Sequence, residues 1–155
     1  MRIAIGADHA GYEAKERLKR RLGERGVDME DVGTHGTASV DYPDFAARVS
    51  RLVAAGKADV GVLVCGSGIG MSIAANKVKG IRAAHCTDSY TARLAREHND
   101  ANVLCMGSRV TGPGLMEEVL DVFLNASFQG GRHANRVDKV MRLEATEPGE
   151  PRIGC

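Results

Sequence analysis

The sequence lacks several features that mark particular classes of protein. It contains no tryptophan, aromatic residues make up only 4% of it, and its formal net charge is +1. A nearly neutral chain offers no general electrostatic attraction to nucleic acid or to an anionic membrane. Few aromatic side chains are present to stack on single-stranded bases. We therefore expect neither a nucleic-acid partner nor a membrane partner.

Closely spaced cysteines and long apolar runs are also missing. The cysteines are Cys65, Cys86, Cys105 and Cys155. No CxxC pair occurs, which argues against a zinc site and a disulfide scaffold and favours free thiols in a reducing compartment. The longest uncharged run, 60–75, is too short to cross a bilayer, and Asp8 interrupts the N-terminus before a signal-peptide core could form. These features predict a cytoplasmic protein without a metal.

Short apolar runs alternate with amphipathic segments along the chain. Five runs are predicted to be strands, at 2–6, 27–32, 59–65, 81–86 and 102–106. Apolar residues at helical spacing occur at 14–22, 45–53, 90–94, 115–123 and 137–141. This order predicts a three-layer α/β/α Rossmann-like fold with a five-stranded parallel sheet. We expect one domain over residues 1–144 and an irregular tail over 145–155, where two prolines oppose helix formation.

Residues able to do chemistry follow the predicted strands. Asp8 and His9 follow the first strand, Cys65 ends the third, and Arg109 follows the fifth. In open parallel sheets, ligands bind beyond the carboxyl ends of the strands. Asp8 could instead cap the next helix, and His9 could be an ordinary loop residue.

A glycine-rich loop over residues 66–70 joins the third strand to a helix. Backbone N–H groups in such a loop, together with a helix N-terminus, suit an anion. Met71 stands where the dinucleotide fingerprint requires glycine, and no P-loop lysine follows. A thiol at this position, Cys65, would have a stabilised thiolate and could act as a base, although burial in the core is the more common fate of cysteine.

A histidine and two arginines complete the set of candidates. His98 is expected near a helix C-terminus, where an imidazolium is favoured whether or not it is catalytic. Arg132 and Arg136 are spaced i and i+4 at the start of the last helix, so they share one face. Two such guanidinium groups suit a phosphate dianion, and a solvated surface pair is the alternative.

Together these segments resemble the type B ribose-5-phosphate isomerases, within the superfamily that also holds subunits of galactose-6-phosphate isomerase. The matching segments cover residues 1–144 in order. They are Gly6-Ala7-Asp8-His9-Ala10-Gly11, Asp41-Tyr42-Pro43, Cys65-Gly66-Ser67-Gly68-Ile69-Gly70, Ile73-Ala74-Ala75-Asn76-Lys77, Arg96-Glu97-His98-Asn99-Asp100-Ala101-Asn102-Val103-Leu104, Gly107-Ser108-Arg109 and Gly130-Gly131-Arg132-His133. The resemblance implies the interconversion of ribose 5-phosphate and ribulose 5-phosphate, in the non-oxidative branch of the pentose phosphate pathway. It also implies that the reaction needs no metal and no organic cofactor.

The resemblance also implies roles for single residues. Cys65 corresponds to the general base that moves a proton between C1 and C2 through an enediolate, and His98 to the residue that opens the furanose ring. The anion hole corresponds to Gly66, Ser67, Gly68, Ile69 and Gly70, with the hydroxyl of Ser67 assisting. One branch of the family carries a glutamate as base at the position of Met71, so this sequence is similar to the cysteine branch.

The remaining matched positions correspond to substrate contacts. Asp8 and Asn99 correspond to sugar-binding residues. His9 corresponds to a residue near the sugar ring and the phosphate. The phosphate side corresponds to Arg109, Arg132 and Arg136. In the family, the last two reach into a neighbouring subunit's site, which implies a homodimer with shared active sites. The sequence does not decide whether such dimers pair into tetramers.

Two other functions remain open from the sequence. The same chemistry on a hexose 6-phosphate, such as allose or galactose 6-phosphate, is the nearer alternative. The other is a Rossmann-type regulatory module that binds a nucleotide without catalysis, in which Asp88 would bind a ribose about 20 residues after Gly66. Met71 breaks that fingerprint, and a nucleotide site has no need of Cys65 or His98.

Overall fold

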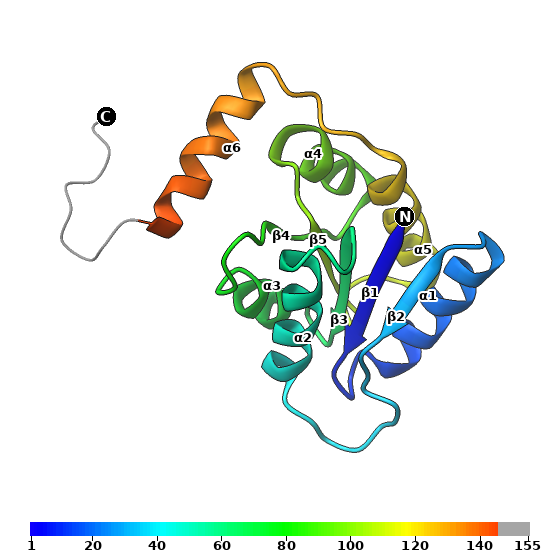
Figure 1. Ribbon diagram of the computed structural model, residues 1–155. Helices are drawn as coiled ribbons and strands as arrows, with labels where there is room; N and C mark the ends of the chain where they lie inside the picture. Colours follow the sequence, from blue (N-terminus) through cyan, green and yellow to red (C-terminus); the bar gives the residue numbers. More distant parts are fainter. Residues whose placement is uncertain (146–155) are drawn as a thin grey trace.

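Strands and helices alternate along the part of the chain that the computed structural model describes, residues 1–145 (Figure 1). The strands are β1 (Arg2–Ala7), β2 (Asp28–Asp31), β3 (Val60–Cys65), β4 (Ala83–His85) and β5 (Val103–Gly107). The helices are α1 (Tyr12–Glu24), α2 (Tyr42–Ala54), α3 (Ile69–Ala75), α4 (Ser89–Asn99), α5 (Pro113–Asn125) and α6 (Arg132–Arg142), followed by the 3-10 helix η1 (Leu143–Ala145). Ten residues of the predicted tail, 146–155, and Cys155 with them, lie outside the described residues.

The five strands form one parallel sheet in the order β2-β1-β3-β5-β4. From β1 the chain moves outward to β2 and then returns to place β3 on the other side of β1. A crevice opens where the strand order reverses in this way, beyond the carboxyl ends of β1 and β3. The predicted fold class is confirmed, and these two strand ends are where open parallel sheets generally bind ligands.

Helices cover both faces of the sheet. On one face α1, α4 and α5 pack against β1, β3 and β5, and Leu18 and Phe123 are fully buried there. On the other face α2 and α3 pack through Val49 and Met71. All six residues of β3 are buried, which confirms its prediction as a central strand and gives the loop that follows it a rigid base.

The two edge strands are shorter than predicted. β2 covers four of the six predicted residues, and β4 covers three of six. At the start of β4, two backbone N–H groups donate to side chains instead of to a neighbouring strand. The N–H of Arg82 donates to Oδ1 of Asn102 (2.8 Å), and the N–H of Ala83 donates to Oδ1 of Asn76 (2.8 Å). An apolar run predicts a buried segment, but where pairing stops at an edge depends on such neighbours.

The last helix lies outside the three layers. In Figure 1, α6 extends past α4, away from the sheet. The segment before it is tied to α4, because the N–H of Gln129 donates to the carbonyl of Glu97 (3.0 Å). Among residues 1–145, no helix combines the length and the apolar character that a bilayer crossing requires.

Candidate active site

The thiol of Cys65 lies at the carboxyl end of β3, under the glycine-rich loop. Its side chain is 4% exposed, and its Sγ accepts a hydrogen bond from the backbone N–H of Gly68 at 3.1 Å. Gly68 has φ +82°, and a Cβ there would lie 2.5 Å from the ring of His85, so the turn that delivers this N–H requires glycine. A donor in this position interacts more strongly with a thiolate than with a thiol.

Other N–H groups of the loop are left without acceptors. The N–H groups of Gly66 and Ser67 make no hydrogen bond with any other described residue. The hydroxyl of Ser67 accepts the N–H of Ile69 at 3.3 Å, where α3 begins. Unpaired donors beside the thiol can bind an oxyanion, as predicted for this loop.

The turn after β1 carries two of the predicted substrate residues. Asp8 is 7% exposed, and its Oδ1 accepts the N–H of Gly11 at 2.9 Å. Its Oδ2 receives no hydrogen bond from the described residues, so the carboxylate both shapes the turn and keeps acceptor capacity. Nδ1 of His9 lies 3.2 Å from both the N and the O of Val40, which leaves Nε2 available in either tautomer.

These residues meet in one cavity of about 360 Å³, a suitable volume for a small ligand. The predicted residues that line it are Asp8, His9, Cys65, Gly66, Ser67, Gly70 and Arg109. A larger hollow of about 410 Å³ lies between α1 and α5, beyond Ala10 and Arg109, and Cys65 does not line it. The smaller cavity is therefore the one that collects the predicted residues, Cys65 among them.

Tyr42 also lines this cavity, although the sequence predicts no role for it. Its ring lies so close to Gly70 that a Cβ on that glycine would be 2.8 Å from it. Its only signal in the sequence is the matching segment Asp41-Tyr42-Pro43. Because proline is common in the first turn of a helix, that segment by itself predicts only the start of α2.

The guanidinium of Arg109 lies beside the loop, with its Nε and Nη1 3.5 Å from where a Cβ of Gly66 would be. None of the carboxylates in the described part of the chain is within ion-pair distance of it. A cation without a protein partner, at the edge of a cavity with free N–H groups, favours an anionic ligand such as a phosphate.

The remaining predicted residues gather at α4 and α6. The ring of His98 stacks on that of His133, with centroids 4.1 Å apart and planes 7° apart. Asn99 and Arg136 line one hollow of about 270 Å³ at the same place. Burial lowers the pKa of His133, and the nearby His98, Arg132 and Arg136 lower it further.

This second group lies at the opposite end of the sheet from Cys65. The carbonyl of Asn99 accepts a hydrogen bond from Nε of Arg82, just before β4, and the carbonyl of Asn102 accepts one from the N–H of Gly61, near the start of β3. The end of α4 is therefore at the amino ends of the strands. Because β3 has six residues, roughly 17 Å separates its two ends. One chain does not bring His98 to Cys65.

The chain is similar to known proteins over most of its length. The sequence profile of a family described as Ribose/Galactose Isomerase matches residues 3–140. The chain belongs to this family. Ribose-5-phosphate isomerase B of Escherichia coli K12 is 47% identical over 143 residues, which cover 92% of this chain and 96% of the relative. Ribose-5-P isomerase B of Listeria innocua is 44% identical over 144 residues, covering 93% and 97%.

Solved structures of the ribose/galactose isomerase family share the whole fold. Ribose-5-phosphate isomerase B of Clostridium thermocellum superposes with a TM-score of 0.93 at 54% identity, covering 94% of this chain and 98% of that one. The type B ribose 5-phosphate isomerase of Trypanosoma brucei gives 0.89 at 52% identity, covering 92% and 97%. The resemblance drawn from the sequence is confirmed, and membership of this family argues against a nucleotide-binding regulatory module.

Proposed function

We propose that this protein interconverts D-ribose 5-phosphate and D-ribulose 5-phosphate. The observation that carries the proposal is the hydrogen bond from Gly68 to the sulfur of Cys65, inside a cavity that also holds Asp8, His9 and Arg109. Proton abstraction next to a carbonyl needs a base, an oxyanion site and an anchor for the rest of the substrate. The relatives named ribose-5-phosphate isomerase B support the choice of sugar.

The proposed reaction moves one hydrogen between two carbons. In the open-chain aldose, Sγ of Cys65 as thiolate takes the proton from C2, and the electron pair of that C–H bond forms a C1–C2 double bond while O1 takes the negative charge. The thiol then returns the proton to C1. A proton passes from O2 to O1, which leaves the ketone at C2 and a hydroxyl at C1. No oxidant or metal enters this balance.

The glycine-rich loop is proposed to stabilise the enediolate. The N–H groups of Gly66 and Ser67 have no acceptor within the described residues and lie beside the thiol, so they can donate to O1 as its charge grows. Arg109 is proposed to bind the phosphate. Binding energy from the phosphate, far from the reacting carbons, can then hold C1 and C2 against the base.

A second copy of the chain is proposed to complete each site. From the sequence, only Arg132 and Arg136 are expected to come from a neighbour. His98 and Asn99 lie with that pair at α4 and α6, roughly the length of β3 away from Cys65. We therefore assign all four residues to the partner's site, with His98 opening the furanose ring there.

A coupled assay with ribose 5-phosphate tests the proposed function. Purified protein should convert ribose 5-phosphate faster than allose 6-phosphate or galactose 6-phosphate, and a chelator should not change the rate. Higher turnover of a 6-phosphate would favour the hexose alternative. Loss of activity with chelator, restored by added metal, would contradict the mechanism through Cys65 alone.

A further inference from the structure

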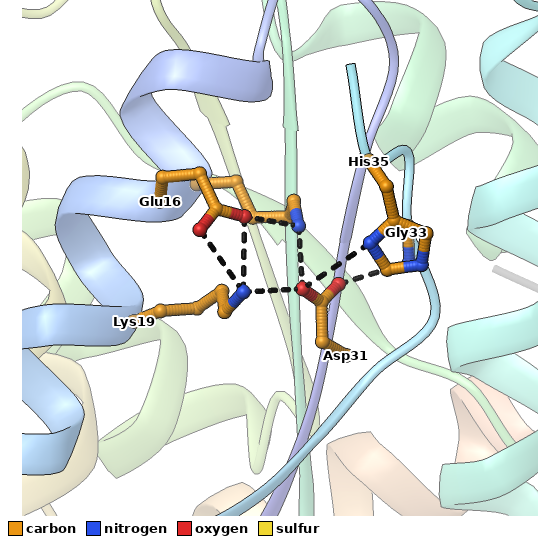
Figure 2. A network of polar contacts seen from close by, with 6 residues as sticks. Glu16, Lys19, Asp31, Gly33 and His35 are labelled. Atoms are coloured by element: carbon orange, nitrogen blue, oxygen red, sulfur yellow. Dashed lines mark hydrogen bonds and ion pairs between the residues drawn. The ribbon is translucent and has the colours of Figure 1, made fainter.

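A fully buried lysine lies behind the candidate site and does not line its cavity. Lys15, on α1, is 0% exposed. Its Nζ donates to Oδ2 of Asp31 at 2.6 Å and to Oε1 of Glu16 at 2.7 Å. Lys19 joins the same carboxylates, with its Nζ 2.6 Å from Oδ2 of Asp31 (Figure 2). We call Lys15, Glu16, Lys19 and Asp31 the Lys15 network, in which Lys15 is buried and the other three are partly exposed.

Such a network is weak evidence for stability by itself. Removing a lysine ammonium from water costs free energy that its ion pairs offset only when the geometry is good, and an apolar pair of similar volume is often as stable. Burial alone would raise the pKa of Asp31, but hydrogen bonds from Lys15, Lys19 and Gly33 outweigh it and lower that pKa. The carboxylate therefore stays charged, and its contacts stay fixed, over the neutral pH range.

Asp31 connects the network to the backbone that precedes the sugar-binding turn. Its Oδ1 accepts the N–H of Gly33 at 2.9 Å. The carbonyl of Gly33 accepts the N–H of Ala7, and the carbonyl of Ala7 accepts the N–H of Thr34, both at 2.8 Å. Ala7 is the last residue of β1, directly before Asp8. This side of the turn is therefore held through Asp31.

Lys15 itself holds the other side of the turn. Its N–H donates to the carbonyl of Gly11 at 2.8 Å, in the first turn of α1. Gly11 in turn donates its N–H to the carboxylate and the carbonyl of Asp8. The ion pair from Lys15 to Asp31 thus joins the two ends of the segment that carries Asp8 and His9.

We propose that Lys15 is a positioning residue, which fixes the turn of Asp8 and His9 against the cavity by joining α1 to the end of β2. The inference rests on the proposed function, since it takes Asp8 as a sugar contact and Cys65 as the base. Cys65 is held separately, by β3 and the loop after it. Loss of Lys15 should therefore affect substrate binding more than the proton transfer.

The test is the kinetics of Lys15→Met, which keeps most of the side-chain volume and removes the charge. We expect KM for ribose 5-phosphate to rise about tenfold while kcat stays within about threefold of wild type. Lys19→Met is the matched control. It removes the same charge and a contact of the same length to Asp31 from a partly exposed site, and its KM should stay within about twofold.

Two further measurements keep the result decisive. The rate at which iodoacetamide modifies Cys65 should be the same in Lys15→Met as in wild type, since the loop is intact. If Lys15→Met does not fold, Asp31→Asn replaces it, because the amide oxygen can still accept the N–H of Gly33 while the ion pair is weakened, and KM should rise in the same direction.

Each contrary outcome has a distinct meaning. An unchanged KM in the Lys15 variant, or an equal rise in Lys19→Met, would overturn the positioning role. A fall in kcat with constant KM would overturn it as well. Wild-type protein that does not isomerise ribose 5-phosphate would instead refute the proposed function.

Discussion

At the scale of single residues, the surroundings of the three cysteines within residues 1–145 separate one thiol from the other two. Burial raises the pKa of Cys86 to about 11 and raises that of Cys105 well above its ordinary value. Both are therefore neutral core residues at pH 7. Cys65 is just as hidden from solvent, but its sulfur meets a backbone donor at the edge of a cavity. Burial alone cannot distinguish a structural thiol from a catalytic one.

Replacement of Cys65 by alanine tests its role as the base. We expect turnover of Cys65→Ala to fall at least roughly 100-fold, since the proton acceptor is lost, while sugar-phosphate affinity measured by calorimetry changes little. Cys86→Ala is the matched control, because it removes a buried thiol on the other face of the sheet and should keep activity. Normal turnover in Cys65→Ala would show that Cys65 is a structural core residue and not the base.

The role of His98 can be tested by the choice of substrate. D-Erythrose 4-phosphate has no free hydroxyl in the position that closes a five-membered ring, so it needs no ring opening. We expect His98→Asn to slow ribose 5-phosphate by about 100-fold and erythrose 4-phosphate by no more than about threefold. An equal loss on both substrates would assign His98 to substrate binding or to the packing of α4.

Sequence reasoning at this scale found the residues that belong to motifs and missed those defined by packing. Asp8, His9 and Arg109 follow strands and Cys65 ends one, so their shared cavity could be predicted. The burial of Lys15 could not be predicted, because a lysine in an amphipathic helix is normally solvated. It depends on Asp31, which lies on β2, sixteen residues later in the sequence.

At the scale of elements, α4 and α6 depend on each other through two stacked rings. His133 is buried, and its pKa lies below the ordinary value near 6.5, which is the reference for the unfolded chain. Between the lowered pKa and 6.5 the unfolded state binds more protons than the folded state. The packing of α6 on α4 therefore weakens as pH falls through that range, and above about pH 7 the imidazole is neutral in both states and contributes no pH dependence.

Hydrogen exchange of the α6 amides at several pH values checks this dependence. Protection in α6 should fall between pH 7 and pH 5.5, and it should fall less in His133→Phe, which keeps an aromatic ring but cannot be protonated. Protection in α2, on the far face of the sheet, serves as the internal control. A pH effect on α6 that is unchanged in His133→Phe would exclude the imidazole as its cause.

The order of elements was the best-predicted level. Every predicted strand has a counterpart, and α1 and α2 end within two residues of Gly26 and Gly56, where positive φ angles stop the helices. The spatial order of the strands was not predicted, since periodicity records burial and not neighbours. The consequence of a parallel sheet for His98 was also missed, because a helix between parallel strands returns its C-terminus to their amino ends.

At the scale of the whole molecule, the described chain holds the predicted site residues in two groups at opposite ends of one sheet. The first contains Cys65 with the loop, Asp8 and Arg109, and the second contains His98 and Arg136. A two-fold symmetric pair of chains could join the first part of one copy to the second part of the other, twice. The exposed position of α6 outside the layers is what such an exchange requires (Figure 1).

Mixed dimers of two inactive variants test this arrangement. Cys65→Ala carries the defect in the first part, and the double variant Arg132→Ala, Arg136→Ala carries it in the second. In a mixed dimer with shared sites, one site collects both defects and the other is intact. Random mixing makes about half the dimers mixed, with half their sites intact, so about a quarter of wild-type activity should return.

A second mixture supplies the control and decides where His98 belongs. When His98→Asn is mixed with the double arginine variant, both defects lie in the second part, so each site of the mixed dimer receives one of them and no activity should return. Different tags on the two chains show that mixed dimers have formed. If His98 acted in the site of its own chain's Cys65, this second mixture would also recover about a quarter of wild-type activity, because one site would then be free of both defects. An inactive first mixture with verified mixed dimers would show that each site is built within one chain.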